Sequence, residues 1–228
     1  MSDLTSNINE VLEDVRQAAA RSGRDPAEIG IVAVTKTVPA ETVRLAVSAG
    51  LLILGENRVQ ELTAKYPLVE GAEWHLIGHL QRNKVKYITD KVSLIHSLDS
   101  AVLAEEIDRR MSSMGRVMDV LVQVNIAEDP NKYGIKANQV IDFVETAAQL
   151  QGIRIRGLMT IGPYVSDPEE IRPVFRELRK LAENVKKMDL PGVDMRHLSM
   201  GMSNDYIVAI EEGATLVRIG SAIFGTRK

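Results

Sequence analysis

A lysine that closes an apolar run is the residue whose type and position most directly permit covalent chemistry. Residues 31–35 read Ile-Val-Ala-Val-Thr, and Lys36 follows before Pro39 breaks the run. Because parallel α/β sheets and barrels carry their chemistry at the carboxyl ends of the strands, a functional side chain is expected at this position. The amine of Lys36 can form an imine with an aldehyde. A solvated lysine that merely ends a strand is the alternative.

Two loops near the carboxyl terminus contain glycine and serine and form a second candidate site. Gly201 has Ser199 and Ser203 beside it, and Gly220 is followed by Ser221. Unhindered backbone N–H groups beside hydroxyls are typical of the phosphate-binding loops after the seventh and eighth strands of a (β/α)8 barrel. Ordinary turn chemistry explains either loop alone, but the two together favour a phosphate site.

Arg218 interrupts an otherwise apolar strand. Strand alternation puts Arg218 and Gly220 on the same face. If Gly220 lies at a phosphate loop, Arg218 points to the barrel mouth. A guanidinium there is costly unless a ligand or a partner balances its charge. A structural ion pair with Glu211 or Glu212 is the alternative to a ligand.

The histidines could suggest a metal site. His75 and His79 are four residues apart, which is the spacing of helical metal ligands, but they flank the end of a predicted strand and Gly78. They therefore do not share a helical face. His96 lies at the end of the next predicted strand. Since no third ligand is recognisable beside His75 and His79, we predict no metal site.

Hydrophobic periodicity predicts a helix followed by about eight strands that alternate with helices. The leading helix covers 7–21, with its apolar residues on one face. The predicted strands are 31–35, 51–54, 73–77, 92–96, 117–124, 153–157, 195–198 and 215–219. The predicted helices between them include 40–49, 57–65, 99–113, 137–150 and 168–188.

Strict alternation favours parallel strands with crossover helices, and eight such strands close naturally into a single (β/α)8 TIM barrel. The leading helix is an addition to that barrel. An open doubly wound sheet is the alternative, but it usually carries a glycine-rich turn after its first strand. Here that turn reads Lys-Thr-Val-Pro and contains no glycine. The sequence therefore predicts an α/β barrel with an extra N-terminal helix.

Length, charge and composition restrict the class of protein. The 228 residues predict one domain, 1–228. A net charge of −3 argues against general nucleic-acid binding, and no apolar run is long enough to span a membrane. No secretory signal is visible, and there are no cysteines to form disulfides or thiolate sites. We expect a cytoplasmic protein.

Stretches in order along nearly the whole chain resemble one family, the pyridoxal-phosphate homeostasis proteins, which are single-domain relatives of the alanine racemase N-terminal barrel. The matching stretches are 32–36 (VAVTK), 55–61 (GENRVQE), 74–84 (WHLIGHLQRNK), 123–126 (QVNI) with Lys132 and Gly134, 157–159 (GLM), 198–203 (LSMGMS) and 217–225 (VRIGSAIFG). Two departures are mild: Thr35 stands where many members have Ser, and Arg58 where many have Tyr. The resemblance implies a fold type III protein that binds pyridoxal 5′-phosphate (PLP).

The resemblance also implies a set of cofactor-binding residues. It implies that Lys36 carries PLP as an internal aldimine, that Arg218 faces the pyridine nitrogen and that Asn57 lies near the ring. The residues implied to hold the phosphate are Ser199, Gly201, Gly220 and Ser221. Because Arg218 cannot accept a hydrogen bond from a protonated ring nitrogen, the ring would be a weak electron sink.

The function that the resemblance implies is a non-catalytic PLP carrier, which buffers or delivers the cofactor in vitamin B6 and amino-acid homeostasis. A PLP-dependent amino-acid racemase is an alternative, but it needs acid/base groups on both faces of the cofactor. We expect the second domain that provides one in alanine racemases to be missing, and Tyr164 is the least implausible substitute. A Schiff-base aldolase using Lys36 is a third reading. We expect a monomer, with PLP-dependent client enzymes as candidate partners.

Overall fold

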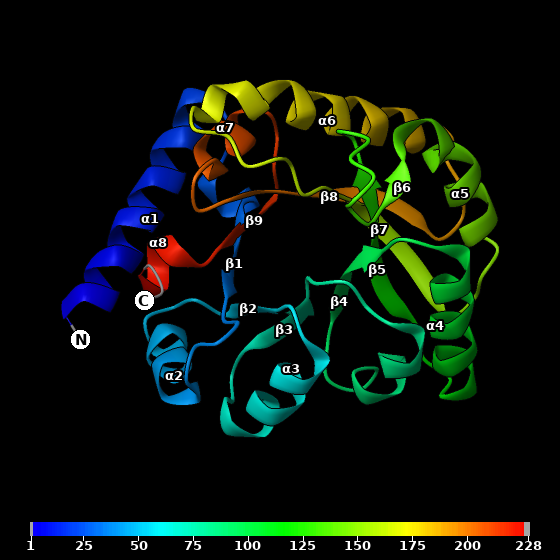
Figure 1. Cartoon of the computed structure of the whole chain (residues 1–228), viewed down its shortest axis with the longest axis horizontal. Helices are drawn as coiled ribbons and strands as arrows, with labels where there is room; N and C mark the ends of the chain where they lie inside the picture. The colour runs from blue at the N-terminus through cyan, green and yellow to red at the C-terminus, as the bar shows by residue number, and fades with distance from the viewer. Residues whose placement is uncertain (1, 226–228) are drawn as a thin grey trace.

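A closed ring of parallel strands forms the centre of the molecule. The computed structural model describes residues 2–225, and Figure 1 shows the ring enclosed by helices. The strands follow the order β1–β2–β3–β4–β5–β7–β8–β9, and β9 pairs again with β1. Their bounds are β1 Gly30–Val34, β2 Ile53–Glu56, β3 Glu73–Leu76, β4 Leu94–Leu98, β5 Met118–Asn125, β7 Ile153–Met159, β8 Val193–Met202 and β9 Leu216–Ile219. The predicted eight-stranded barrel is confirmed.

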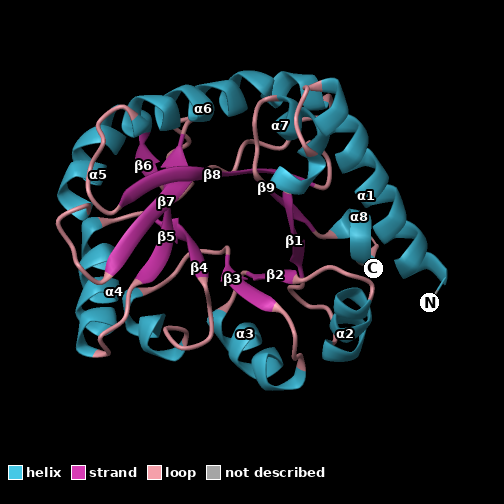
Figure 2. Cartoon of the chain, turned by 180° about the vertical axis from the view of Figure 1, so that it is seen from behind, coloured by secondary structure: helices cyan, strands magenta, loops and turns pink. Residues whose placement is uncertain are grey.

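The helices lie outside the ring in both views (Figures 1 and 2). They are α1 Ser2–Arg21, α2 Ala40–Ser48, α3 Val59–Lys65, α4 Ala101–Ser113, α5 Val140–Ala147, α6 Arg172–Lys186, α7 Tyr206–Glu211 and α8 Ser221–Phe224. Short 3-10 segments supplement them at Pro26–Glu28, Tyr66–Leu68, Arg82–Tyr87, Ala137–Gln139 and Pro168–Ile171. The predicted domain 1–228 includes Met1 and residues 226–228, which lie outside the described part. None of the helices within residues 2–225 is long and apolar enough to cross a membrane.

One strand was not predicted. β6, Ile135–Lys136, pairs only with the end of β5 and lies outside the closed ring. Two residues are too few to show a period in the sequence. Gly134 lets the chain return so close to β5, because its φ is 127° and a Cβ there would lie 2.8 Å from the backbone nitrogen of Asn125.

The extra helix α1 packs against α7 and α8, the two helices that follow β8 and β9 (Figure 2). The hydroxyl of Tyr206 on α7 donates to Asp14 at 2.6 Å, and the amide of Asn7 donates to the carbonyl of Ile223 on α8 at 3.0 Å. The first helix of the chain therefore supports the loops at Gly201 and Gly220, which the sequence predicts to bind phosphate.

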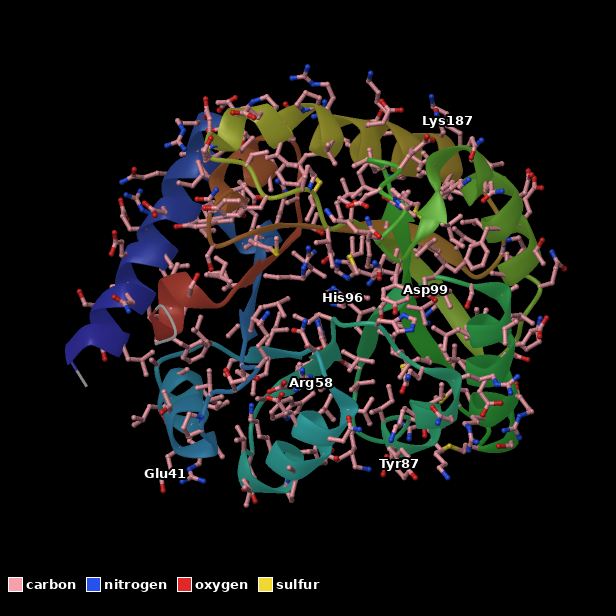
Figure 3. All side chains as sticks on the ribbon, in the orientation of Figure 1. Glu41, Arg58, Tyr87, His96, Asp99 and Lys187 are labelled. Carbon is pink, nitrogen blue, oxygen red and sulfur yellow. The ribbon has the colours of Figure 1, made fainter. Side chains whose placement is uncertain are left out.

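The interior of the ring combines an apolar cluster with a set of buried polar side chains. The apolar cluster consists of Val32, Val34, Ile77, Leu94, Leu121, Met159 and Leu216. His75, His96, Ser199 and Arg218 are buried among the same strands, and Figure 3 shows His96 inside the ring. Branched apolar residues usually fill this space in such barrels. The polar residues are therefore costly here and require a specific set of partners.

Candidate functional site

Lys36 lies in a turn just after β1, at the carboxyl-end rim of the barrel, and is half-buried. The next residue, Thr37, has a φ of 62°, a left-handed conformation that costs energy in a residue other than glycine. The N–H of Thr37 donates to Glu61 Oε2 at 2.6 Å. This acceptor on α3 stabilises the turn and so fixes the direction in which the chain presents Lys36.

The residue before Lys36 is also held, by a buried charged network. Thr35 Oγ1 donates to Glu56 Oε1 at 2.7 Å. Lys65 Nζ donates to the same carboxylate oxygen at 2.6 Å and to the carbonyl oxygen of Thr35 at 2.6 Å. The side chain of Glu56 is fully buried, and that of Lys65 is 12% exposed. The backbone on both sides of Lys36 is thus fixed to β2 and α3.

Arg218 points from β9 into the barrel, as strand alternation predicts, and is buried. Its Nη1 donates to Ser199 Oγ at 2.7 Å and its Nη2 donates to the carbonyl oxygen of Thr160 at 2.9 Å. Burial lowers the pKa of Arg218 to about 10, so the side chain stays charged at neutral pH. The alternative ion pair was wrong: Glu211 and Glu212 contact arginines of α6 instead.

The two predicted phosphate loops contact each other through Ser203. The Ser203 hydroxyl oxygen accepts the N–H groups of Gly220 at 3.1 Å and of Ala222 at 3.3 Å. Gly201 has a φ of 89°, and a Cβ there would lie 2.5 Å from a side chain of α7. From the sequence alone, Ser203 is a hydroxyl beside Gly201 and is not among the predicted cofactor residues. Its link to Gly220 depends on the close approach of β8 and β9.

The segment after β1 and the loop after β9 border a common hollow. A cavity of about 220 Å³ is lined by Val34, Thr37, Val38, Pro39, Thr42, Gly220, Ser221, Phe224 and Gly225. The turn that contains Lys36 therefore adjoins Gly220 and Ser221.

Asn57 lines a different cleft, of about 500 Å³, together with Arg58, Val59, Gln60, Glu61, His79, Gln81 and Lys84. The side-chain oxygen of Asn57 is buried and has no hydrogen-bond partner among the described residues. Because an unpaired buried oxygen is costly, it marks a place for a donor from a bound molecule. Gly78 permits this position, since a Cβ there would lie 2.3 Å from the Asn57 carbonyl oxygen.

Two histidines lie further inside the barrel than the sequence suggested. His75 and His96 were placed at strand ends, but each is the third residue of its strand and is buried. His96 Nε2 lies 3.0 Å from His75 Nδ1, and His96 Nδ1 lies 2.9 Å from Ser199 Oγ. His79 instead pairs with Asp99 at 2.8 Å. Within residues 2–225, no group of three His, Cys, Asp or Glu side chains could hold a metal.

The family of the chain follows from comparison with known proteins. The family model described as "alanine racemase, N-terminal domain" matches residues 7–228. A protein of Aquifex aeolicus named pyridoxal phosphate homeostasis protein is 45% identical over 223 residues, which cover 97% of each chain. This chain belongs to the pyridoxal phosphate homeostasis protein family. The resemblance of its sequence motifs to that family is confirmed.

Solved structures agree with this family. PipY of Synechococcus elongatus, solved with PLP bound, is 35% identical, with a TM-score of 0.82 over 93% of this chain and 100% of that one. A diaminopimelate decarboxylase of M. jannaschii is 14% identical, with a TM-score of 0.77 over 96% of this chain and 59% of that one. At that identity the second similarity shows the fold alone.

Proposed function

We propose that this chain binds PLP at the carboxyl-end rim of the barrel and buffers or delivers it, without turning over a substrate. The observation that carries the proposal is Arg218, a buried cation whose two acceptors are both neutral. Such a charge favours an anionic ligand at the same rim. The name of the Aquifex relative and the PLP bound to PipY support the choice of PLP as that ligand.

The residues present fit the group. When bound, PLP supplies an aldehyde that captures amines and a phosphate that carries negative charge. Lys36 would hold the aldehyde covalently, and Arg218 would face the ring nitrogen. Asn57, which lines the neighbouring cleft, has an unpaired side-chain oxygen that would accept a hydrogen bond from a donor near the ring. Of the residues that the resemblance implies for the phosphate, Gly201, Gly220 and Ser221 would bind it, whereas the Ser199 hydroxyl accepts from Arg218. Ser203 would hold the two loops together.

The side chains at the site favour storage over catalysis. Arg218 keeps its proton at neutral pH and only donates, so it would leave the ring nitrogen unprotonated and the ring a weak electron sink. Tyr164, the least implausible second acid/base group, is 89% exposed. An exposed tyrosine is not held against one face of a cofactor, and racemisation requires such a group. We therefore propose a non-catalytic carrier.

The test is the visible absorption spectrum of the purified protein with added PLP, before and after borohydride. We expect a yellow band that borohydride removes while it adds the reduced cofactor's mass to the peptide containing Lys36. The variant Lys36→Ala should lose the labelled site, while Lys84→Ala, a lysine that lines the neighbouring cleft, should keep it. Absence of the band, or labelling of another lysine, would contradict the proposed cofactor attachment.

The carrier role has its own test. Incubation of the PLP-loaded protein with a panel of amino acids in heavy water should show no exchange of the α-proton above that of free PLP. Robust exchange that disappears in Lys36→Ala would establish a catalyst instead.

We also propose that the protein is a cytoplasmic monomer that delivers PLP to client enzymes. Light scattering tests the monomeric state. To separate delivery by contact from release, an apo-enzyme is placed behind a dialysis membrane that the carrier cannot cross. Reactivation there shows release, and reactivation only when the two proteins mix shows contact.

A further inference from the structure

A continuous chain of hydrogen-bonding side chains crosses the barrel interior, from the amino-end rim of β3 to Arg218. Glu73 Oε1 lies 3.2 Å from His75 Nε2, and His75 Nδ1 lies 3.0 Å from His96 Nε2. His96 Nδ1 lies 2.9 Å from Ser199 Oγ, which accepts from Arg218 Nη1 at 2.7 Å. The chain draws its residues from β3, β4, β8 and β9.

Burial makes this series of hydrogen-bonded side chains energetically costly. His75, His96, Ser199 and Arg218 are each at most 4% exposed, whereas the side chain of Glu73 is 51% exposed at the rim. Apolar residues would fill the same interior without the cost of desolvating polar groups. A fully paired polar network in that place rigidifies and specifies one arrangement. Its value therefore lies in the orientation of the groups at its end.

Glu73 sets the direction of every hydrogen bond in the chain. Hydrogen bonds from His75 and Ser93 lower the pKa of Glu73 to about 2, so its carboxylate is ionised and can only accept. His75 Nε2 must then carry a proton. In a neutral His75, the Nδ1 atom accepts, and it accepts from His96 Nε2–H.

His96 passes the same direction on to Ser199. Burial, together with the nearby His75, Arg218 and His197, lowers the pKa of His96 well below its ordinary value, so His96 is neutral. With its proton on Nε2, its Nδ1 accepts the hydroxyl proton of Ser199. The Ser199 oxygen then has only lone pairs to offer elsewhere, and one of them receives the N–H of Arg218.

We propose that Glu73, His75 and His96 are positioning residues that fix the Ser199 hydroxyl as an acceptor and thereby hold Arg218 as a donor toward the cofactor. The cofactor end of this inference rests on the proposed function. The role of Ser199 differs from the phosphate contact that the resemblance implies, because its hydroxyl proton is committed to His96. The amino-end rim of the barrel thus acts on the opposite rim through side chains alone.

The first experiment needs no cofactor. The chain has four histidines, so nitrogen-15 spectra of the cofactor-free protein at pH 7 can be assigned with His79→Gln and His197→Gln. We expect His75 and His96 both to carry their proton on Nε2. In Glu73→Gln the amide can also donate to His75, which removes the fixed direction, and both rings should populate the Nδ1–H form. A wild-type His96 with its proton on Nδ1, or unchanged rings in Glu73→Gln, would overturn the inference.

A matched control distinguishes this role from a general effect of removing a rim charge. Asp119 lies near the same end of β5 but receives its hydrogen bonds from Arg154 and Arg156. Asp119→Asn should leave the tautomers of His75 and His96 unchanged. Altered tautomers in this variant would contradict a specific role for Glu73.

The second experiment measures the cofactor end. Glu73→Gln should weaken PLP affinity about tenfold, the value of one hydrogen bond, and should shift the pH profile of the bound cofactor's absorption band. Asp119→Asn should change neither. Altered tautomers with unchanged PLP affinity would overturn the positioning role. If the wild-type protein binds no PLP, the proposed function fails, while the tautomers still decide whether Glu73 directs the chain.

Discussion

Two buried polar networks lie at the same rim of this barrel, and they balance charge differently. Next to Lys36, the carboxylate of Glu56 is paired with the ammonium of Lys65 at 2.6 Å. On the other side, Arg218 contacts only a hydroxyl and a carbonyl oxygen. In the first network the ammonium of Lys65 also lies 3.5 Å from Glu61 Oε2, so carboxylates more than balance the cation, and Glu56 Oε2 has no hydrogen-bond partner among the described residues. In the second, the guanidinium makes no ion pair within residues 2–225, and the carboxyl of Asp205 acts on it only as a nearby charge.

This difference separates a structural role from a binding role. The Glu56–Lys65 ion pair fixes the backbone at Thr35, just before Lys36. A buried cation that faces neutral acceptors reduces the stability of the free protein, and an anionic ligand can recover that loss. The four predictions that follow test this contrast, from the largest expected effect to the smallest.

Breaking the Glu56–Lys65 pair should cause the largest loss of stability. Glu56→Gln leaves the largely buried ammonium of Lys65 with only the more distant carboxylate of Glu61, at 3.5 Å, and we expect the free energy of unfolding to fall by about 3 kcal/mol. Urea denaturation of the cofactor-free protein measures this. The double variant Glu56→Gln/Lys65→Met should lose much less than the sum of the single changes. A loss below about 1 kcal/mol in Glu56→Gln would show that this pair is not the structural unit described.

Replacing Arg218 should have the opposite effect: little change in stability and a large loss of PLP affinity. Arg218→Met removes a buried cation whose two hydrogen-bond acceptors are neutral, so we expect the cofactor-free protein to stay within about 1 kcal/mol of the wild-type stability. PLP affinity should fall about a hundredfold, because hydrogen bonds to a charged group are lost. Urea denaturation and titration of the visible absorption band measure the two quantities. A large loss of stability with unchanged affinity would reverse the comparison.

Between pH 7 and 5, acid should lower the stability of the protein mainly through its buried histidines. Burial holds the pKa of His96 well below 6.5, so below that pH the unfolded chain binds a proton that the folded chain does not. Stability is therefore fully present above about pH 6.5 and is lost as pH falls toward the folded pKa, by at most about 1.4 kcal/mol per unit for one group. Unfolding midpoints at pH 7, 6 and 5 should show this slope. His96→Gln should reduce it, and the part that remains should come from His197, whose pKa burial also lowers.

The link between the two phosphate loops should have the smallest effect. Ser203→Ala removes the acceptor of the Gly220 and Ala222 N–H groups, and we expect a loss of about 1 kcal/mol in stability. Ser203→Thr keeps a hydroxyl and is the matched control. Thermal unfolding with and without PLP measures both variants. A PLP affinity that rises in Ser203→Ala would show that Ser203 competes with the phosphate for these N–H groups.

Much of the fold could be predicted from local pattern. Apolar runs separated by amphipathic segments gave all eight barrel strands, since a strand buried on both faces is apolar throughout. The strand β6 was missed because two residues carry no period. The site could be predicted in part, because Lys36, Gly220 and Ser221 stand next to strand ends that any reading of the chain would locate. The alternative partners of Arg218 were wrong, since Glu211 and Glu212 lie at the end of α7 and contact arginines of α6, whereas Arg218 points into the ring.

The sequence by itself determined the parallel barrel, the position of Lys36 after the first strand, and membership of the family through motifs along the chain. Only the tertiary structure decided that His75 and His96 point inward and join Glu73 to Arg218, and that Ser203 ties two loops together. The physical reason is the separation in sequence between the interacting residues. Strand and helix patterns arise from neighbouring residues, whereas a hydrogen bond between strands far apart in sequence depends on how the ring closes and on the register in which its strands pair.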